Sequence, residues 1–162
     1  MNQRILGVDP GTHTVGVAVI NTEPLSLEHT TPIEVRAKTP ESCLAYLREA
    51  LYLFVSDLHQ MGHLPDLAVV EDVFIGYNSK GSLALAQARG ALLAAIGCWD
   101  IPVVGYSPTT VKEQVTGHGH KDKLGVAEGV AKVLHLNDSP IRSEHEWDAI
   151  AIALTPVLLA RP

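Results

Sequence analysis

The stretch RILGVDPGTHTVGVAVI near the N-terminus constrains the fold more than any other part of the sequence. Its two apolar, partly β-branched runs, residues 4–9 and 14–20, predict two buried strands, and Pro10 with Gly11 predicts the turn between them. Asp9 nevertheless stands where the first strand should still be apolar. Burying a lone carboxylate costs free energy unless a cation or several donors compensate it. The hairpin therefore requires a partner for Asp9.

The rest of the chain predicts further strands and helices in alternation. The remaining strands are expected at residues 30–36, 67–71 and 101–106. The first helix is expected from a Thr39 cap and Pro40 to about Gly62, and the second from Ser82 to about Gly97. A third helix is expected after a Ser107 cap, and a fourth follows the HGHKD loop and ends at about Leu134. The last helix is expected after a Ser143 cap. Pro32 predicts that its strand begins there or lies at a sheet edge. This order predicts an α/β fold of three layers, in which a hairpin-led sheet is extended by right-handed β-α-β crossovers and residues 1–162 form one domain.

Composition and charge are those of a soluble globular protein. Of the residues, 46% are hydrophobic and 19% charged, the apolar stretches are too short to span a bilayer, and no basic-then-apolar leader opens the chain. We therefore expect a cytoplasmic protein with no membrane segment, with Cys43 and Cys98 as reduced core thiols. The net charge of −6 argues mildly against nucleic-acid binding. Residues 80–123, however, hold five Lys or Arg against three acids, so this segment carries +2 and the remainder −8.

Two predicted strands end in a carboxylate, Asp9 in the first and Glu71 in LAVVE. In open α/β sheets, sites form at the carboxyl ends of strands, so these two acids are expected to converge. His145 and Asp148 are three residues apart on the last predicted helix and share a face. Three carboxylates and an imidazole need counter-charge, which Mg²⁺ or Mn²⁺ supplies. Two such ions about 3.5–4 Å apart activate water and stabilise the leaving oxygen of a phosphodiester.

Each of these residues also has a simpler interpretation. Asp9 before Pro-Gly commonly forms a turn, Glu71 commonly lies at an edge or caps a helix, and His145 commonly faces water in a first helical turn. Glu146 belongs to a Ser-x-x-Glu capping box with Ser143 and is assigned no site role. The spacing alone leaves both interpretations open.

Four blocks of the sequence resemble the RuvC Holliday-junction resolvases. The blocks are ILGVDPGTHTVGVAVI, VVEDVFIGYNSKGSLALAQARGALLAAI, YSPTTVKEQVTGHGHKDKLGV and EHEWDAIAIAL, and they run collinear with the family from about residue 4 to 154. The resemblance implies a ribonuclease-H-like fold with a five-stranded mixed sheet, a homodimer, and metal-dependent symmetric cutting of a four-way DNA junction in recombination and repair. It also implies a branch-migration motor of the RuvA and RuvB type as partner.

The resemblance assigns roles to individual residues by position. The metal-binding catalytic set corresponds to Asp9, Glu71, His145 and Asp148, with two Mg²⁺ or Mn²⁺ ions per site. Lys112 and Lys123 match basic residues near the scissile phosphate, where Lys123 would stabilise developing phosphoryl charge. Phe74 matches an aromatic that packs against bases at the junction centre. Contacts to backbone phosphates are expected for Lys80, Arg89 and Lys121. From the residues alone, Phe74 can equally be a core residue and Lys123 a solvated lysine.

Two positions carry open alternatives. Asp72 stands where the family commonly has Gln, and an extra acid beside Glu71 is expected to alter metal preference or repel DNA. Gly90, inside an Ala-rich helix, allows close approach of another helix, either in a dimer interface or within the domain.

Two other classes of protein fit parts of the same sequence. DPGT matches the Asp-x-Gly-Thr phosphate hairpin of the actin and sugar-kinase superfamily, but that architecture needs a second hairpin, which this sequence lacks. The other alternative is a non-catalytic junction-binding scaffold on the same fold. Replacing Asp9 by Ala distinguishes a nuclease, which loses cutting but keeps binding, from a scaffold, which loses nothing.

Overall fold

The computed structural model describes residues 2–73, 79–117, 123–136 and 143–161. The strands are β1 (Arg4–Asp9), β2 (Thr14–Thr22), β3 (Leu25–Glu34), β4 (Leu67–Glu71) and β5 (Val103–Tyr106). The helices are α1 (Pro40–Gln60), α2 (Ser79–Gly97), α3 (Pro108–Thr116), α4 (Lys123–Leu134) and α5 (Glu144–Leu159). The element order predicted from the sequence is confirmed.

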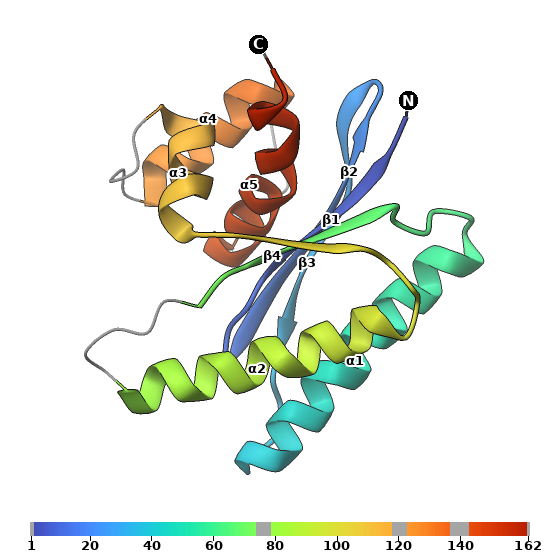
Figure 1. Ribbon diagram of the computed structural model, residues 1–162, viewed down its shortest axis with the longest axis vertical. Coiled ribbons are helices and arrows are strands. Elements are labelled where there is room, and N and C mark those ends of the chain that lie inside the picture. The colour runs from blue at the N-terminus through green and yellow to red at the C-terminus, as the bar shows by residue number, and fades with distance from the viewer. Residues whose placement is uncertain (1, 74–78, 118–122, 137–142, 162) are drawn as a thin grey trace.

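The strands form one mixed sheet in the order β3-β2-β1-β4-β5. β1 pairs antiparallel with β2, and β2 with β3, whereas β1, β4 and β5 run parallel. β3 is an edge strand, as Pro32 predicted. Helices α1 and α2 lie on one side of the sheet and α3, α4 and α5 on the other, which gives the three expected layers (Figure 1).

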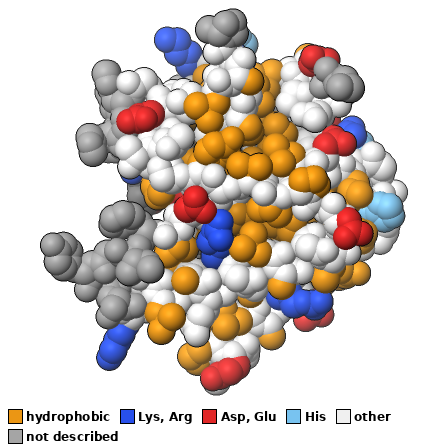
Figure 2. Space-filling model, in the orientation of Figure 1, with side chains coloured by type: hydrophobic (Ala, Val, Ile, Leu, Met, Phe, Trp, Pro, Cys, Tyr) orange, Lys and Arg blue, Asp and Glu red, His pale blue; other side chains and the backbone are white. Residues whose placement is uncertain are grey.

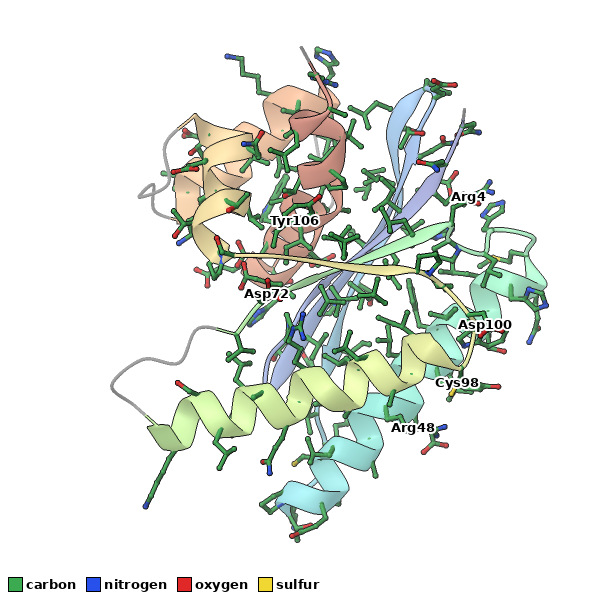
Figure 3. The ribbon with its side chains drawn as sticks, in the orientation of Figure 1. Arg4, Arg48, Asp72, Cys98, Asp100 and Tyr106 are labelled. Carbon is green, nitrogen blue, oxygen red and sulfur yellow. The ribbon has the colours of Figure 1, made fainter. Side chains whose placement is uncertain are left out.

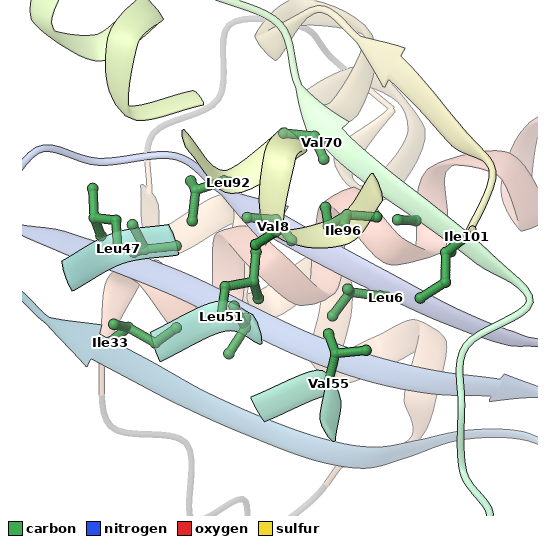
Figure 4. Close-up of a cluster of buried hydrophobic side chains, with 14 of the residues drawn as sticks. Leu6, Val8, Ile33, Leu47, Leu51, Val55, Val70, Leu92, Ile96 and Ile101 are labelled. Atoms are coloured by element: carbon green, nitrogen blue, oxygen red, sulfur yellow. The ribbon is translucent and has the colours of Figure 1, made fainter. Parts of the chain in front are cut away.

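Period-two alternation along the strands divides the interior into two cores. Leu6, Val8 and Val70 face α1 and α2, where they meet Leu47, Leu51, Val55, Leu92 and Ile96 (Figure 4). Ile5, Val69 and Ile20 face the other way and pack against α3, α4 and α5. Strands covered on both faces have to be apolar at nearly every position, as β1 is between Arg4 and Asp9 and β4 is up to Glu71.

Side-chain caps start three helices where the sequence predicted them. Thr39 accepts a hydrogen bond from the backbone of Ser42, and Ser107 does the same at the start of α3. At α5, Ser143 accepts from the backbone N–H of Glu146 while the Glu146 carboxylate accepts from the backbone of Ser143, which completes the capping box. Within the described ranges, none of the helices combines the length and apolar character needed to cross a bilayer.

Several predicted boundaries are wrong by a few residues. β3 begins at Leu25 instead of residue 30, because it pairs with β2 directly after a tight turn, and its backbone pairing does not need β-branched side chains. α2 begins at Ser79 instead of Ser82, since one glycine near its start costs only about 1 kcal/mol. β5 omits residues 101–102, where Pro102 has no N–H to donate.

One prediction about the cysteines is also wrong. Both thiols are free, but Cys98 is exposed and Cys43 is only half-buried. Cys98 lies just after α2, outside the sheet-facing side of that helix, and its thiol donates to the carbonyl of Ala94. It is therefore not a core residue.

Candidate active site at the carboxyl edge of the sheet

The candidate site begins with two strand ends. β1 and β4 are parallel neighbours whose register pairs Val8 with Val70, so that Asp9 and Glu71, one residue further on, reach the same edge of the sheet. Odd-numbered side chains of both strands face the α5 side, as Val69 does. Period-two alternation therefore directs both carboxylates toward the side that α5 covers.

Two glycines let α5 lie directly on the sheet. A Cβ at Gly7 would collide with the backbone carbonyl of Ala149, and one at Gly16 would collide with the backbone carbonyl of His145. Gly16 is also the cross-strand partner of Asp9. The missing side chains thus bring the first turn of α5 to the level at which β1 ends.

His145 contacts Asp9 directly. Its Nδ1 lies 2.9 Å from Oδ2 of Asp9, a hydrogen bond in which the ring nitrogen donates to the carboxylate. The Asp9 side chain is only 13% exposed. Asp9 is therefore more than a turn former, and His145, although its side chain is 40% exposed, is held to it across 136 residues of sequence.

Glu71 has a strongly raised pKa. Burial and the neighbouring charges of Asp9 and Asp148 raise its pKa from 4.5 to about 8, and Asp72 adds to the rise. Lys112, on α3, opposes the rise in this pKa. The four predicted ligands and Lys112 are thus electrostatic neighbours, although Lys112 alone does not neutralise the acids.

This donor set fits a divalent cation bound through oxygen. Burial raises the pKa of Glu71, and the charges of Asp9 and Asp148 add to the rise; a Mg²⁺ or Mn²⁺ ion would stabilise the ionised carboxylates. The residues that would hold it are Asp9, Glu71, His145 and Asp148. With Nδ1 of His145 donating to Asp9, Nε2 is the ring nitrogen left to ligate a metal.

Arg89 has a different environment from the one expected. Its Nε donates to the backbone carbonyl of Glu71 at 2.9 Å, and its Nη2 donates to Oδ1 of Asp72 at 2.7 Å. The Asp72 carboxylate also lies against Gly105 on β5, where a Cβ would not fit. Arg89 thus compensates the extra acid beside Glu71, and a DNA phosphate would have to compete with Asp72 for it.

The other predicted DNA contacts are placed only in part. Lys80 is exposed near the start of α2. Phe74 and Lys121 lie outside the described residues, as does the side chain of Lys123, the first residue of α4.

Trp147 was not among the site residues selected from the sequence. It lines a hollow of about 240 Å³ together with Leu124, Ala127, Glu144 and Asp148. The hollow therefore adjoins the acidic cluster. A larger one, about 620 Å³, lies between α3, α4 and the end of the chain and includes none of the four predicted ligands. An aromatic residue preceding a predicted metal ligand was the one signal that pointed to Trp147.

Known proteins similar to this chain identify its family. The model of the family "Crossover junction endodeoxyribonuclease RuvC" matches residues 5–156. The chain belongs to the RuvC family. A RuvC from Synechococcus sp. (strain CC9311) is 34% identical over 165 residues, covering 94% of this chain and 96% of the relative. One from Pasteurella multocida is also 34% identical, covering 93% of this chain and 77% of the relative.

Solved structures agree with the family assignment. The RuvC of Thermus thermophilus in complex with a Holliday junction substrate superposes with a TM-score of 0.82 at 29% identity, over 98% of this chain and 95% of that one. The yeast mitochondrial Holliday junction resolvase Ydc2, at 14% identity and a TM-score of 0.59, shares the fold. The predicted ribonuclease-H-like fold is therefore confirmed.

Proposed function

We propose that this protein is a metal-dependent endonuclease that resolves four-way (Holliday) DNA junctions by symmetric paired nicks during recombination and repair. The observation that carries the proposal is the part-buried acidic cluster at the carboxyl edge of a RuvC-family sheet, in which Glu71 lies close to the charges of Asp9 and Asp148. The Thermus relative with a Holliday junction substrate supports the choice of DNA. Residues 1–162 would then form one nuclease domain that works in the cytoplasm.

The metal-binding residues in this proposal are Asp9, Glu71, His145 and Asp148. Two bound Mg²⁺ or Mn²⁺ ions would supply an activated water and stabilise the leaving oxygen. With a pKa of about 8, the Glu71 carboxyl group is protonated at neutral pH. It would release this proton when its oxygens ligate a cation. Asp9 fixes the ring of His145 by accepting from Nδ1. Metal binding would thus release the proton of Glu71 and compensate the negative charge of the acids.

The remaining residues would bind and position the DNA. Lys112 and Lys123 would meet the scissile phosphate, and Phe74 would stack on a base, an interaction worth about 1–3 kcal/mol. Lys80 and Lys121 would contact backbone phosphates. Arg89 would join them only on leaving Asp72.

The proposal includes a homodimer formed through α2. One stripe of this helix, at the spacing of helical turns, is exposed and made of small or apolar residues: Leu83, Ala86, Gly90, Ala94 and Gly97. A Cβ built at Gly90 or Gly97 meets nothing within 4 Å, so close packing within the described chain does not explain these glycines. Val103 and Val104 of β5 are 40% and 37% exposed, and Figure 2 shows apolar side chains gathered on this face of the molecule. A RuvA–RuvB-type motor is the proposed further partner.

The dimer is tested at Gly90. Gly90→Leu adds a side chain that the single chain has room for but a helix packed across Gly90 does not. We expect this variant to sediment as a monomer at concentrations at which the parent is a dimer. Gln60→Leu, which places the same apolar side chain at an exposed position of α1, should remain dimeric. Equal dimerisation of the two variants would remove α2 from the interface.

The nuclease function is tested with an end-labelled mobile four-way junction and a matched linear duplex. Paired nicks at symmetric positions are expected on the junction only, with Mg²⁺ or Mn²⁺ but not with chelator. Because His145 adds a nitrogen ligand, Mn²⁺ should serve at least as well as Mg²⁺. Asp9→Ala should lower cutting by about 10²-fold or more with junction binding retained. A scaffold protein would bind the junction without cutting it under either metal.

A further inference from the structure

A second group of metal-ligating side chains lies away from the candidate active site. Among the residues that the structure describes, Glu28, His29 and His63 form a group whose three donor atoms all lie within 4.8 Å of one another. Glu28 and His29 belong to the edge strand β3, and His63 follows α1. Figure 3 shows their neighbour Arg4 and the active-site residue Asp72 at opposite ends of the strands. The nuclease proposal uses none of these residues.

A β-bulge brings two neighbouring residues of β3 to the same side of the sheet. The register pairs Val19 with His29 and Ile20 with Leu27, which leaves Glu28 as the extra residue. In a regular strand, consecutive side chains point to opposite faces. The bulge redirects one of them, so that Glu28 reaches Arg4 and Asn21 on the α1 side while His29 faces that side as well.

The end of α1 holds His63 in place. Gly62 adopts a left-handed conformation, with φ of 74°, and donates to the carbonyl of His59. His63 then donates its backbone N–H to Leu58, which completes a Schellman motif. The His63 ring lies 5.9 Å from that of His29, and its Nδ1 lies 4.0 Å from Oε2 of Glu28. The third donor is thus fixed by a helix terminus.

Nδ1 of His63 points to a missing partner. This atom is shielded from solvent and has no hydrogen-bond partner, one of two such side-chain atoms among the described residues. Buried polar atoms without partners are uncommon in folded proteins, and an ion or water commonly satisfies them. Glu28, by contrast, is oriented through Oε2 by Arg4 Nε at 2.8 Å and through Oε1 by Asn21 at 3.2 Å. Each carboxylate oxygen keeps a second lone-pair direction for a metal.

The geometry points to a Zn²⁺ site formed by Glu28, His29 and His63. Two imidazoles and one carboxylate are a common three-ligand set for Zn²⁺, with water as the fourth ligand. Bonds of about 2.0–2.2 Å put tetrahedral ligands about 3.4 Å apart, so small side-chain rotations close the present separations. The bound ion would tie the edge strand β3 to the connection between α1 and β4. It would stabilise the fold without taking part in DNA cutting.

The test measures Zn²⁺ binding in the full chain carrying Asp9→Asn and Glu71→Gln, which weaken the candidate active site. After dialysis against Zn²⁺, elemental analysis should find about one ion per chain. Zinc should raise the melting temperature by about 5 °C or more at roughly 100-fold above Kd. Adding His29→Gln or His63→Gln should weaken Zn²⁺ binding by roughly tenfold or more and so reduce the rise at the same Zn²⁺ concentration by about half or more. His135→Asn, which removes an exposed histidine at positive φ, is the control that should change neither.

Two further measurements locate the bound Zn²⁺ and separate this inference from the nuclease proposal. Ring ¹⁵N resonances of His29 and His63, and of no other histidine, should shift on adding Zn²⁺ to the same background, which reports the site even where a variant fails to fold. Junction cutting in Mg²⁺ by the chain with only His63→Gln should equal that of the parent, so this inference and the nuclease proposal can fail separately. Unshifted His29 and His63 resonances, or Zn²⁺ binding by the two glutamine variants equal to that of His135→Asn, would overturn the site.

Discussion

The acids at the two ends of the central strands have opposite electrostatic environments. At the amino end, Glu28 accepts hydrogen bonds from Arg4 and Asn21, and Asp66 accepts one from the backbone of Arg4. At the carboxyl end, burial together with the neighbouring charges of Asp9 and Asp148 raises the pKa of Glu71 to about 8. The amino end is compensated by the chain itself, and a Zn²⁺ ion there would add to a set of contacts that already exists.

The comparison distinguishes carboxylates that stabilise the fold from carboxylates that are placed to bind a ligand. A carboxylate paired within the chain contributes to stability whatever the solution contains. A carboxylate crowded by others opposes folding until a cation arrives, and proteins keep such groups where function needs them. The same substitution, Glu to Gln, should therefore have opposite effects at the two ends.

The largest expected effect is that of Glu71→Gln against Glu28→Gln. The folded-state pKa of Glu71 is about 8 against an ordinary value of 4.5, so the folded chain binds an extra proton between pH 4.5 and 8. Its contribution to stability is fully present below pH 4.5 and is lost as pH rises through 8. Glu71→Gln keeps a neutral group at every pH. With chelator it should match the parent at low pH and be more stable by on the order of 3 kcal/mol at pH 9.

Glu28→Gln is the matched control for this comparison. It breaks the part-buried ion pair with Arg4 and should lower the free energy of unfolding by about 1 kcal/mol near neutral pH. Urea unfolding at pH 5, 7 and 9 measures both variants. If Glu71→Gln lost stability at pH 9 as Glu28→Gln does, the two ends would not differ in the way described.

Gly16→Ala should produce the next largest effect, because it separates α5 from the carboxyl end. The new Cβ collides with the backbone carbonyl of His145 and should cost about 2 kcal/mol of stability. Displacing the helix also moves His145 from Asp9, so cutting should fall by more than the unfolded fraction explains. Gln60→Ala, at an exposed position of α1 away from α5 and from the proposed dimer stripe, should change stability by less than about 0.5 kcal/mol and leave cutting unchanged. Thermal melts and junction cutting of the two variants, compared side by side, measure the difference; equal melting temperatures would contradict it.

Much of this arrangement could be predicted from the sequence because it depends on local rules. Alternation in β1 and β4, the caps at Thr39, Ser107 and Ser143, and the position of two acids at strand ends were enough for the element order and for the edge at which the site lies. The resemblance to RuvC added the roles, which spacing alone left open. Those roles remain proposals.

The parts that could not be predicted depend on contacts between distant residues. Arg89 was expected to reach a phosphate, but it pairs with Asp72 across 17 residues of sequence, and only the fold shows that pair. The bulge that turns Glu28 beside His29 depends on pairing with β2, which no local pattern reveals. The close contact of α5 with the sheet depends on the missing side chain of Gly16. In the sequence, a glycine within a strand indicates only a weaker strand.

The smallest expected change in stability is that of an Asp72 variant. At the carboxyl end Asp72 is paired with Arg89, as Glu28 is paired with Arg4 at the amino end. Asp72 is 52% exposed, so Asp72→Gln should change the free energy of unfolding by less than about 1 kcal/mol. It should release Arg89 to bind a phosphate, and the slope of log Kd against log salt for junction binding should steepen by about one. Arg89→Gln should leave the slope at the value of the parent, because Arg89 is already occupied there. A slope unchanged by Asp72→Gln would mean that Arg89 stays on the carbonyl of Glu71 and supports β4, so that its pairing with Asp72 serves the fold alone.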